Sequence, residues 1–114
     1  MDIQTDIERA QAWGANKGIT GPYGTGTIER QSQKLLEECD ETRVGLDKLQ
    51  NAKTTVETWA ALDEIQDGLG DMMVVMILIC EMTGLNFGRC LNSALGVIEA
   101  RTGRMIDGQF VKDK

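Results

Sequence analysis

An aspartate stands directly before a long apolar run, and this pairing limits how the chain folds. Asp71 is followed by residues 72–79, all of which are apolar. A run of this kind belongs in a protein interior, where an ionised carboxylate is costly unless a cation compensates its charge. The sequence therefore predicts an acidic site on a partly buried helix, with a cation beside it.

The bulk composition is typical of one cytoplasmic domain. The chain has 114 residues, 41% of them hydrophobic and 26% charged, which suits a single core and an ordinary surface. The formal net charge of −6 argues against sequence-independent nucleic-acid binding, which needs a basic surface. Residues 1–6 lack the features of a signal peptide, and residues 69–80 form too short a run to span a bilayer.

The chain contains no histidine. This excludes Ser-His and Cys-His catalysis, the usual zinc ligands and the Glu-x-x-His pattern of ferritin-like di-iron bundles. Acid–base and metal chemistry must therefore fall to carboxylates, lysines, Tyr23 or thiols. The three cysteines, Cys39, Cys80 and Cys90, form no CxxC pair. We expect them to be small core residues of a protein kept in a reducing compartment.

Apolar periodicity and capping residues predict four helices. They are expected at residues 2–13, 28–49, 54–83 and 87–101, with Thr27, Thr54 and Asn86 as N-caps. Residues 14–26 carry five glycines and form either a flexible connection or a lid over a site. The tail after Gly103 has an Asp-Gly turn signal, but we expect an extended arm rather than a hairpin.

We predict an all-α fold because no segment alternates over the length of a strand. The expected architecture is a single domain over residues 1–114, a bundle of four to five helices centred on two long antiparallel ones. Its parts are an N-terminal helix and glycine loop (1–27), the site helices (28–101) and a basic tail (102–114). The third helix is apolar nearly all round between residues 69 and 80, so we expect a second copy to complete the core as a dimer or tetramer.

Two acidic stripes carry the chemistry. In the second predicted helix the stripe consists of Glu37, Glu38 and Glu41, with Lys34 one turn before Glu38. In the third predicted helix it consists of Glu64, Asp67 and Asp71. Antiparallel packing brings the stripes face to face. The converging carboxylates then form an oxygen cage for Mg²⁺ or Mn²⁺ that activates water. The alternative is that both stripes are solvated helix faces.

Basic and aromatic residues complete a candidate substrate site. Arg101, Arg104 and Lys112 follow the fourth predicted helix, where they either meet phosphate charge or complement the helix dipole. Trp13 lies at an apolar position of the first helix and either stacks on a base or packs in the core.

These motifs together resemble the MazG-like all-α nucleoside triphosphate pyrophosphohydrolases, in particular the small proteins common in bacteriophages. The likeness is carried by Lys34-Leu35-x-Glu37-Glu38-x-x-Glu41, by Gly70-Asp71 opening an apolar helix, and by the tail from Arg101 to Lys112. It covers residues 28–112, with weaker similarity around Trp13, Lys17 and Ile19.

The resemblance implies an assembly of at least two subunits and Mg²⁺-dependent cleavage of a nucleoside triphosphate to the monophosphate and pyrophosphate. By motif match, Glu38, Glu41 and Asp71 would be metal ligands, and Glu37 a ligand or the group that orients water. Lys34 and the tail cations Arg101, Arg104 and Lys112 would contact phosphate, and Trp13 and Lys17 would belong to the substrate site. A phage-encoded protein of this kind would act in the host cytoplasm.

One position departs from the family pattern. The usual Glu-x-x-Asp motif places a glutamate at position 68, where this chain has Gly68. Asp67 lies one turn before Asp71 and is the candidate replacement ligand. Two other functions stay open: a non-catalytic helical dimer that binds a nucleotide or a protein, and a hydrolase of alarmones such as ppGpp.

Overall fold

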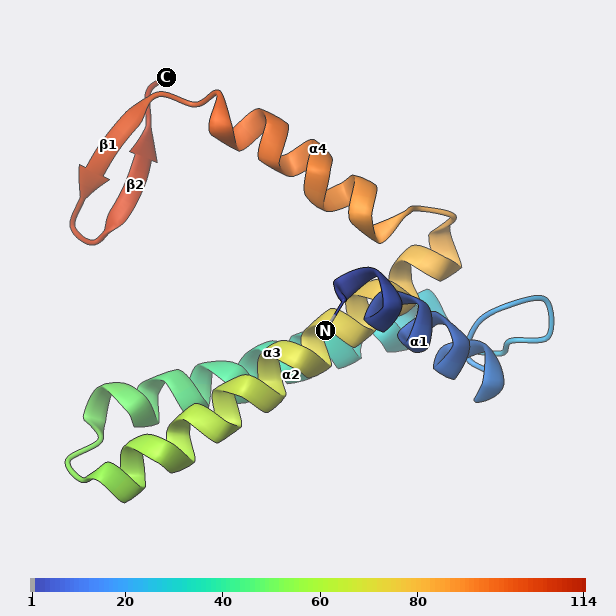
Figure 1. Cartoon of the computed structure of the whole chain (residues 1–114), viewed down its shortest axis with the longest axis horizontal. Coiled ribbons are helices and arrows are strands. Elements are labelled where there is room, and N and C mark those ends of the chain that lie inside the picture. Colours follow the sequence, from blue (N-terminus) through green and yellow to red (C-terminus); the bar gives the residue numbers. More distant parts are fainter. Residues whose placement is uncertain (1) are drawn as a thin grey trace. The chain divides into compact units, whose positions relative to one another are not determined.

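The computed structural model describes residues 2–114 and contains four helices followed by a hairpin (Figure 1). The helices are α1 (Ile3–Asn16), α2 (Ile28–Asn51), α3 (Thr55–Thr83) and α4 (Phe87–Glu99), and the strands are β1 (Gly103–Ile106) and β2 (Gln109–Lys112). The predicted helical character is confirmed. The chain divides into two compact units, Met1–Gly84 and Leu85–Lys114. The single-domain organisation stays a prediction.

Local capping explains where the helices begin and end. Thr27, Thr54 and Asn86 each accept a hydrogen bond from the backbone N–H three residues ahead, which confirms all three predicted N-caps. Gly84 ends α3 with a φ of 76°, a left-handed conformation that glycine adopts readily.

The ends of α1 and α4 differ from the prediction. Helix α1 continues past Gly14 to Asn16. Gly14 lies inside the helix and packs directly on Leu78 of α3. Helix α4 ends at Glu99 rather than at residue 101. The Gly103 expected to stop α4 is the first residue of β1.

Helices α2 and α3 form the antiparallel pair at the centre of the first unit (Figure 1). The two helices lie close together at two glycines. A Cβ atom on Gly45 would lie 3.1 Å from Ile65, and one on Gly68 would collide with the Thr42 hydroxyl. Position 45 thus faces 65 while 42 faces 68, which confirms the predicted antiparallel packing of the two long helices.

Helix α1 packs on α3 and not on α2. Within the described residues, no Cα atom of α1 lies within 8 Å of one in α2, so α3 forms the floor between two separate walls. Ile7, Val75, Ile77 and Leu78 are buried, and Leu78 lies against Gly14 of α1. The apolar run of α3 is covered only in part, because Met73 keeps 36% of its surface exposed.

The second unit corrects two predictions. The tail forms an antiparallel hairpin in which Gly103 faces Lys112 and Ile106 faces Gln109, so the fold is not purely α-helical and the tail is not an extended arm. Asp107 and Gly108 have φ values of 49° and 83°, the two positive values of a two-residue turn whose twist matches that of paired strands.

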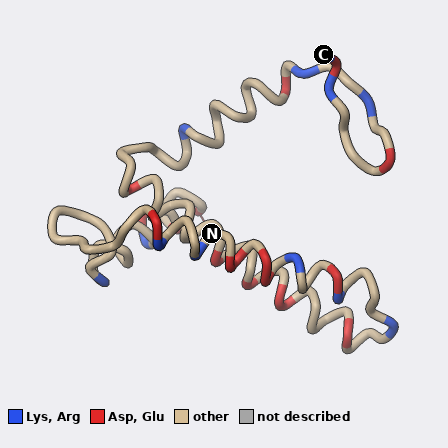
Figure 2. Tube along the Cα trace, turned by 180° about the vertical axis from the view of Figure 1, so that it is seen from behind, with Lys and Arg blue, Asp and Glu red and all other residues tan. Residues whose placement is uncertain are grey.

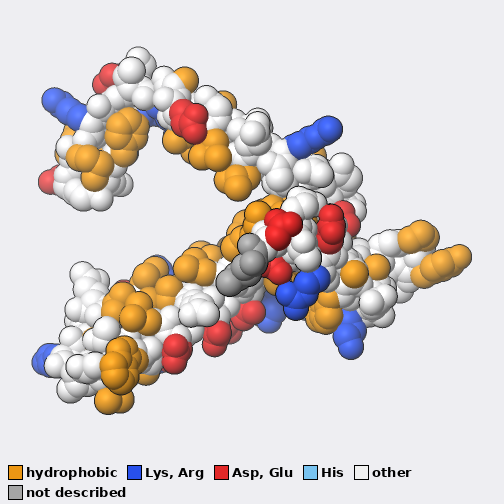
Figure 3. All heavy atoms as spheres, in the orientation of Figure 1, with side chains coloured by type: hydrophobic (Ala, Val, Ile, Leu, Met, Phe, Trp, Pro, Cys, Tyr) orange, Lys and Arg blue, Asp and Glu red, His pale blue; other side chains and the backbone are white. Residues whose placement is uncertain are grey.

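Helix α4 has no buried residue. Its predicted inner face is therefore uncovered within its own unit, and Figure 3 shows apolar side chains gathered along the helix. The residues of that face are Phe87, Cys90, Leu91, Ala94, Leu95 and Ile98. The prediction that all three cysteines are buried is also wrong. Cys80 is buried, whereas Cys39 and Cys90 are exposed, since Cys39 lies beside the α2 face that packs on α3 and nothing in its unit covers Cys90.

In the described part of the chain, no single helix is long and apolar enough to cross a membrane; α3 and α4 reach that length and composition only when taken together.

Candidate metal centre

Glu38 is the one acidic side chain that is buried among the described residues, with 4% of its surface exposed. It lies on the same face of α2 as Thr42 and Gly45, the face that packs against α3. One carboxylate oxygen, Oε1, lies 2.9 Å from Nζ of Lys34. The other, Oε2, is buried and has no hydrogen-bond partner. A buried carboxylate oxygen without a donor is rare and points to a missing ligand.

Lys34 is the cation beside this buried charge. It also lies 3.9 Å from Oε2 of Glu37, whose side chain is 64% exposed. The hydrogen bond to Glu38, together with the negative charge of Glu38, raises the pKa of Lys34. The ammonium therefore stays charged and compensates the buried carboxylate.

Asp71 is exposed, which corrects the prediction that it is enclosed by apolar neighbours. Val75 and Leu78 share its stripe of α3 and are buried. Asp71 lies one turn earlier on the same stripe and is exposed. It lines a cleft of about 1170 Å³ together with Glu38, and a smaller hollow of about 430 Å³ together with Glu41 and Asp67.

The Glu41 carboxyl is influenced by carboxylates of both helices. The negative charge of Glu38 raises the pKa of the Glu41 carboxyl, and the charge of Asp71 acts in the same direction while Lys34 opposes it. Partial desolvation of the Glu41 carboxyl also raises its pKa. Glu38, Glu41 and Asp71 therefore form one electrostatic cluster, and Figure 2 shows the acidic residues following the α2–α3 pair.

This cluster is not arranged as a closed cage. Within the part of the chain that the structure describes, no three carboxylate or thiol side chains gather closely enough to hold one metal ion. Glu41 and Asp71 are exposed, so rotating their side chains toward the cleft meets little resistance. The donor set consists of oxygen atoms, and one of them is buried without a partner. Oxygen donors are the ligands that hard divalent cations such as Mg²⁺ or Mn²⁺ prefer.

The close contact between α2 and α3 explains why position 68 is a glycine. A Cβ atom at this position would collide with Thr42, whose own hydroxyl donates a 2.7 Å hydrogen bond to the carbonyl of Glu38. No larger side chain fits here unless α2 and α3 move apart. Asp67, one residue earlier, lines the smaller hollow with Glu41 and Asp71. Glu64 lines it as well, but both of its carboxylate oxygens bond to Lys48, at 2.9 and 3.1 Å.

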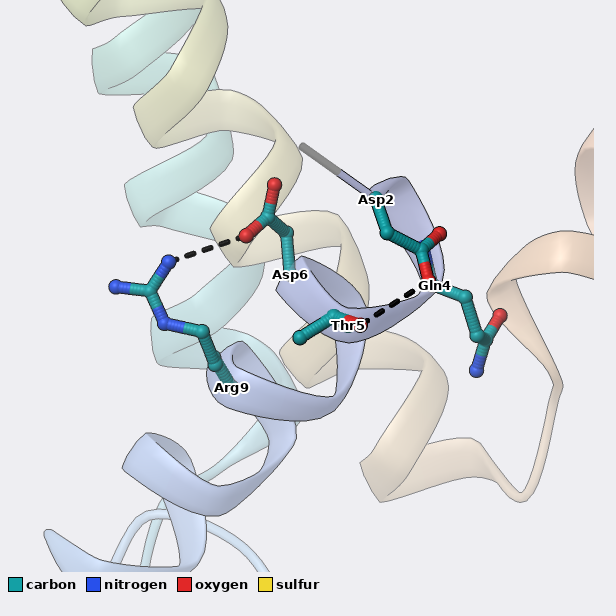
Figure 4. Close-up of polar contacts among 5 residues, drawn as sticks. All are labelled: Asp2, Gln4, Thr5, Asp6 and Arg9. Atoms are coloured by element: carbon teal, nitrogen blue, oxygen red, sulfur yellow. Dashed lines mark hydrogen bonds and ion pairs between the residues drawn. The ribbon is translucent and has the colours of Figure 1, made fainter.

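The larger cleft contains side chains that sequence reasoning missed. Arg9 of α1 and Arg30 and Gln31 of α2 line it beside Lys34. Figure 4 shows Arg9 reaching back along α1 to Asp6, which also lines the cleft. Two features of the sequence could have pointed to these residues. Asp6 and Arg9 are three residues apart on one helix, and Arg30 lies one turn before Lys34.

Only one of the residues predicted to bind substrate through the first and fourth helices and the tail lines the larger cleft. Trp13 lines the cleft and is 47% exposed, so it is not a core residue. Lys17, the C-cap of α1, does not line the cleft. Arg101, Arg104 and Lys112 belong to the second unit, and their predicted contact with phosphate stays a prediction.

Comparison of the chain with protein-family models, with curated proteins and with solved structures finds no match. The likeness to MazG-like proteins therefore rests on the motif residues themselves.

Proposed function

We propose that the chain is a Mg²⁺-dependent nucleoside triphosphate pyrophosphohydrolase. The observation that carries this proposal is the buried carboxylate of Glu38, whose Oε2 atom has no partner and which shares a cleft with Asp71. A purely structural carboxylate would have both oxygens satisfied by donors. The resemblance to MazG-like proteins also supports the proposal. It is carried by Glu37, Glu38 and Glu41 followed by Gly70-Asp71.

The proposed roles follow from position and burial. Glu38, Glu41 and Asp71 would hold the cation, with Asp67 in place of the motif glutamate that Gly68 excludes. A bound Mg²⁺ supplies charge to phosphate oxygens and lowers the pKa of water. Glu37 is exposed and belongs to the same stripe, so it is the group proposed to orient the attacking water and accept its proton. Lys34 would contact phosphate from the wall of the cleft.

The test is incubation of the purified protein with a panel of deoxynucleoside and ribonucleoside triphosphates and ppGpp, with Mg²⁺ or Mn²⁺. We expect a monophosphate and pyrophosphate from at least one triphosphate. Folded protein that yields no product from any member of the panel would refute the hydrolase. Product from ppGpp alone would establish the alarmone reaction instead.

A non-catalytic nucleotide-binding dimer is the second candidate function. Gly68 favours it, because the cage lacks a carboxylate at the position where the family pattern has one. Calorimetry distinguishes the two functions. Nucleotide binding without turnover would support the binding protein, whereas turnover would support the enzyme.

We also propose that two copies of the chain associate to complete the helical core. Leu91, Leu95 and Ile98 of α4 keep 56%, 43% and 51% of their surfaces exposed. Exposed apolar area of this kind is costly in water and marks an interface. Light scattering after gel filtration should therefore give at least twice the monomer mass. The change Leu95→Glu should shift the mass toward the monomer, whereas Glu99→Gln at the helix end should not. A monomeric wild-type chain at micromolar concentration would contradict the proposed assembly.

A further inference from the structure

The cleft beside the proposed metal centre carries two arginines that the metal centre does not use. Arg9 projects from α1 and Arg30 from α2, two helices with no Cα atoms within 8 Å of each other in the described residues. Asp71 and Val75 of α3 lie in the floor between them. A ligand that reached both arginines would have to lie along the cleft.

Both arginines have weak partners within the chain. Arg9 forms an ion pair of 3.1 Å with Asp6, and the two side chains are 79% and 42% exposed. Arg30 donates to the amide oxygen of Gln33 at 3.3 Å. Exposed pairs of this kind add about 0–1 kcal/mol to stability. A ligand with several negative charges can therefore take over both guanidinium groups.

The rest of the cleft has the character of a nucleotide site. Trp13 and Ile19 offer apolar surface, and Glu38 with Asp71 marks the proposed metal position. The cleft volume of about 1170 Å³ is sufficient for a nucleoside triphosphate, since ligand pockets run from about 300 to 1000 Å³. The chain carries a net charge of −6, so a polyphosphate is repelled overall and needs local cations.

We propose that Arg9 and Arg30 bind the outer phosphates of a triphosphate lying along this cleft, and that Asp6 holds Arg9 in position when no ligand is bound. This inference rests on the proposed hydrolase function and extends it to substrate binding. The planar guanidinium fork makes two parallel hydrogen bonds to phosphate oxygens, a geometry that lysine does not reproduce. Asp6 competes with phosphate for the same fork, so it limits the affinity for the ligand.

Titration calorimetry with inorganic tripolyphosphate, with and without Mg²⁺, tests the inference on binding alone. We expect Arg9→Ala and Arg30→Ala each to raise the dissociation constant about 10-fold. Arg30→Lys should retain only part of the affinity. Asp6→Asn should bind about 2- to 5-fold more tightly because the competing charge is gone. Arg43→Ala, an exposed change on α2 away from the cleft lining, is the matched control and should bind as the wild type does.

The outcomes separate this inference from the proposed reaction. Unchanged tripolyphosphate affinity in both alanine variants, or no binding by the wild type, would overturn it. Weaker binding by Asp6→Asn would overturn the role given to Asp6. The protein could bind tripolyphosphate through both arginines and yet hydrolyse no triphosphate. This result would support the phosphate site and contradict the proposed hydrolase function. In an active enzyme, both alanine variants should lower kcat/KM, because the outer phosphates leave as pyrophosphate and the arginines meet the charge that develops on them, whereas Arg43→Ala should leave it unchanged.

Discussion

Replacing Glu38 with glutamine is expected to lower triphosphate hydrolysis by at least about 100-fold, because even groups that only support a metal ligand contribute 10- to 100-fold. The same change should alter the free energy of unfolding by less than about 1 kcal/mol. Glutamine keeps the shape of the side chain and an oxygen that can accept from Lys34. The change also removes a buried charge whose Oε2 atom has no partner.

The small expected effect on stability follows from the exposure of Lys34. Removing one member of a fully buried ion pair costs about 3–5 kcal/mol, because the other charge is left stranded. The Lys34 side chain is 50% exposed, so water solvates its ammonium when the carboxylate is gone. Chemical denaturation and an assay of pyrophosphate release measure the two effects. Asp40→Asn, an exposed neighbour on α2, is the control and should leave both quantities unchanged. Full activity in the Glu38→Gln protein would show that Glu38 does not take part in the reaction.

Adding one methyl group at Gly68 is expected to destabilise the protein by about 1–3 kcal/mol, the usual range for overpacking a tight contact. The new Cβ would collide with Thr42, which is 4% exposed and whose hydroxyl is bonded to the carbonyl of Glu38. Thr42 therefore has no room to move, and α2 must shift away from α3. The shift would separate Glu38 and Glu41 from Asp71, so activity should fall as well.

Gly70 supplies the matched control on the same helix. A Cβ atom built there meets nothing within 4 Å, so Gly70→Ala should stabilise the protein by up to about 1 kcal/mol through helix propensity alone. Thermal unfolding of the two alanine variants should give shifts of opposite sign. Gly68→Glu restores the usual motif and should lose more stability than Gly68→Ala. A Gly68→Glu protein that is both stable and more active would show that the close contact does not exclude the motif glutamate.

Local signals made the helices predictable. N-caps such as Thr54 act on the backbone only three residues ahead, and the periodic apolar positions are read directly from the sequence. The hairpin was missed although Asp107-Gly108 signalled its turn, because strands of four residues leave no alternation to detect. The antiparallel packing of α2 and α3 also followed from the sequence, since two long helices with a short connection pack in that way.

The details of the site depended on which helix faces become covered. Whether Glu38 or Asp71 is buried depends on how far α1 and α2 extend over α3. The spacing of apolar residues does not reveal how far one helix covers another. Arg9 was missed for the same reason, because its place on the cleft wall depends on α1 packing on α3 alone. Gly68 was identified as a departure from the motif, but its contact with Thr42 required coordinates.

Binding of Mn²⁺ to the wild-type chain and to Asp71→Asn is the most direct measurement, with free Mn²⁺ followed by electron paramagnetic resonance. We expect saturable binding by the wild type and an affinity at least about 100-fold lower for the variant, whose helicity should be unchanged. Equal binding by the two proteins, or no binding by the wild type even with a triphosphate present, would show that these carboxylates do not form a metal centre.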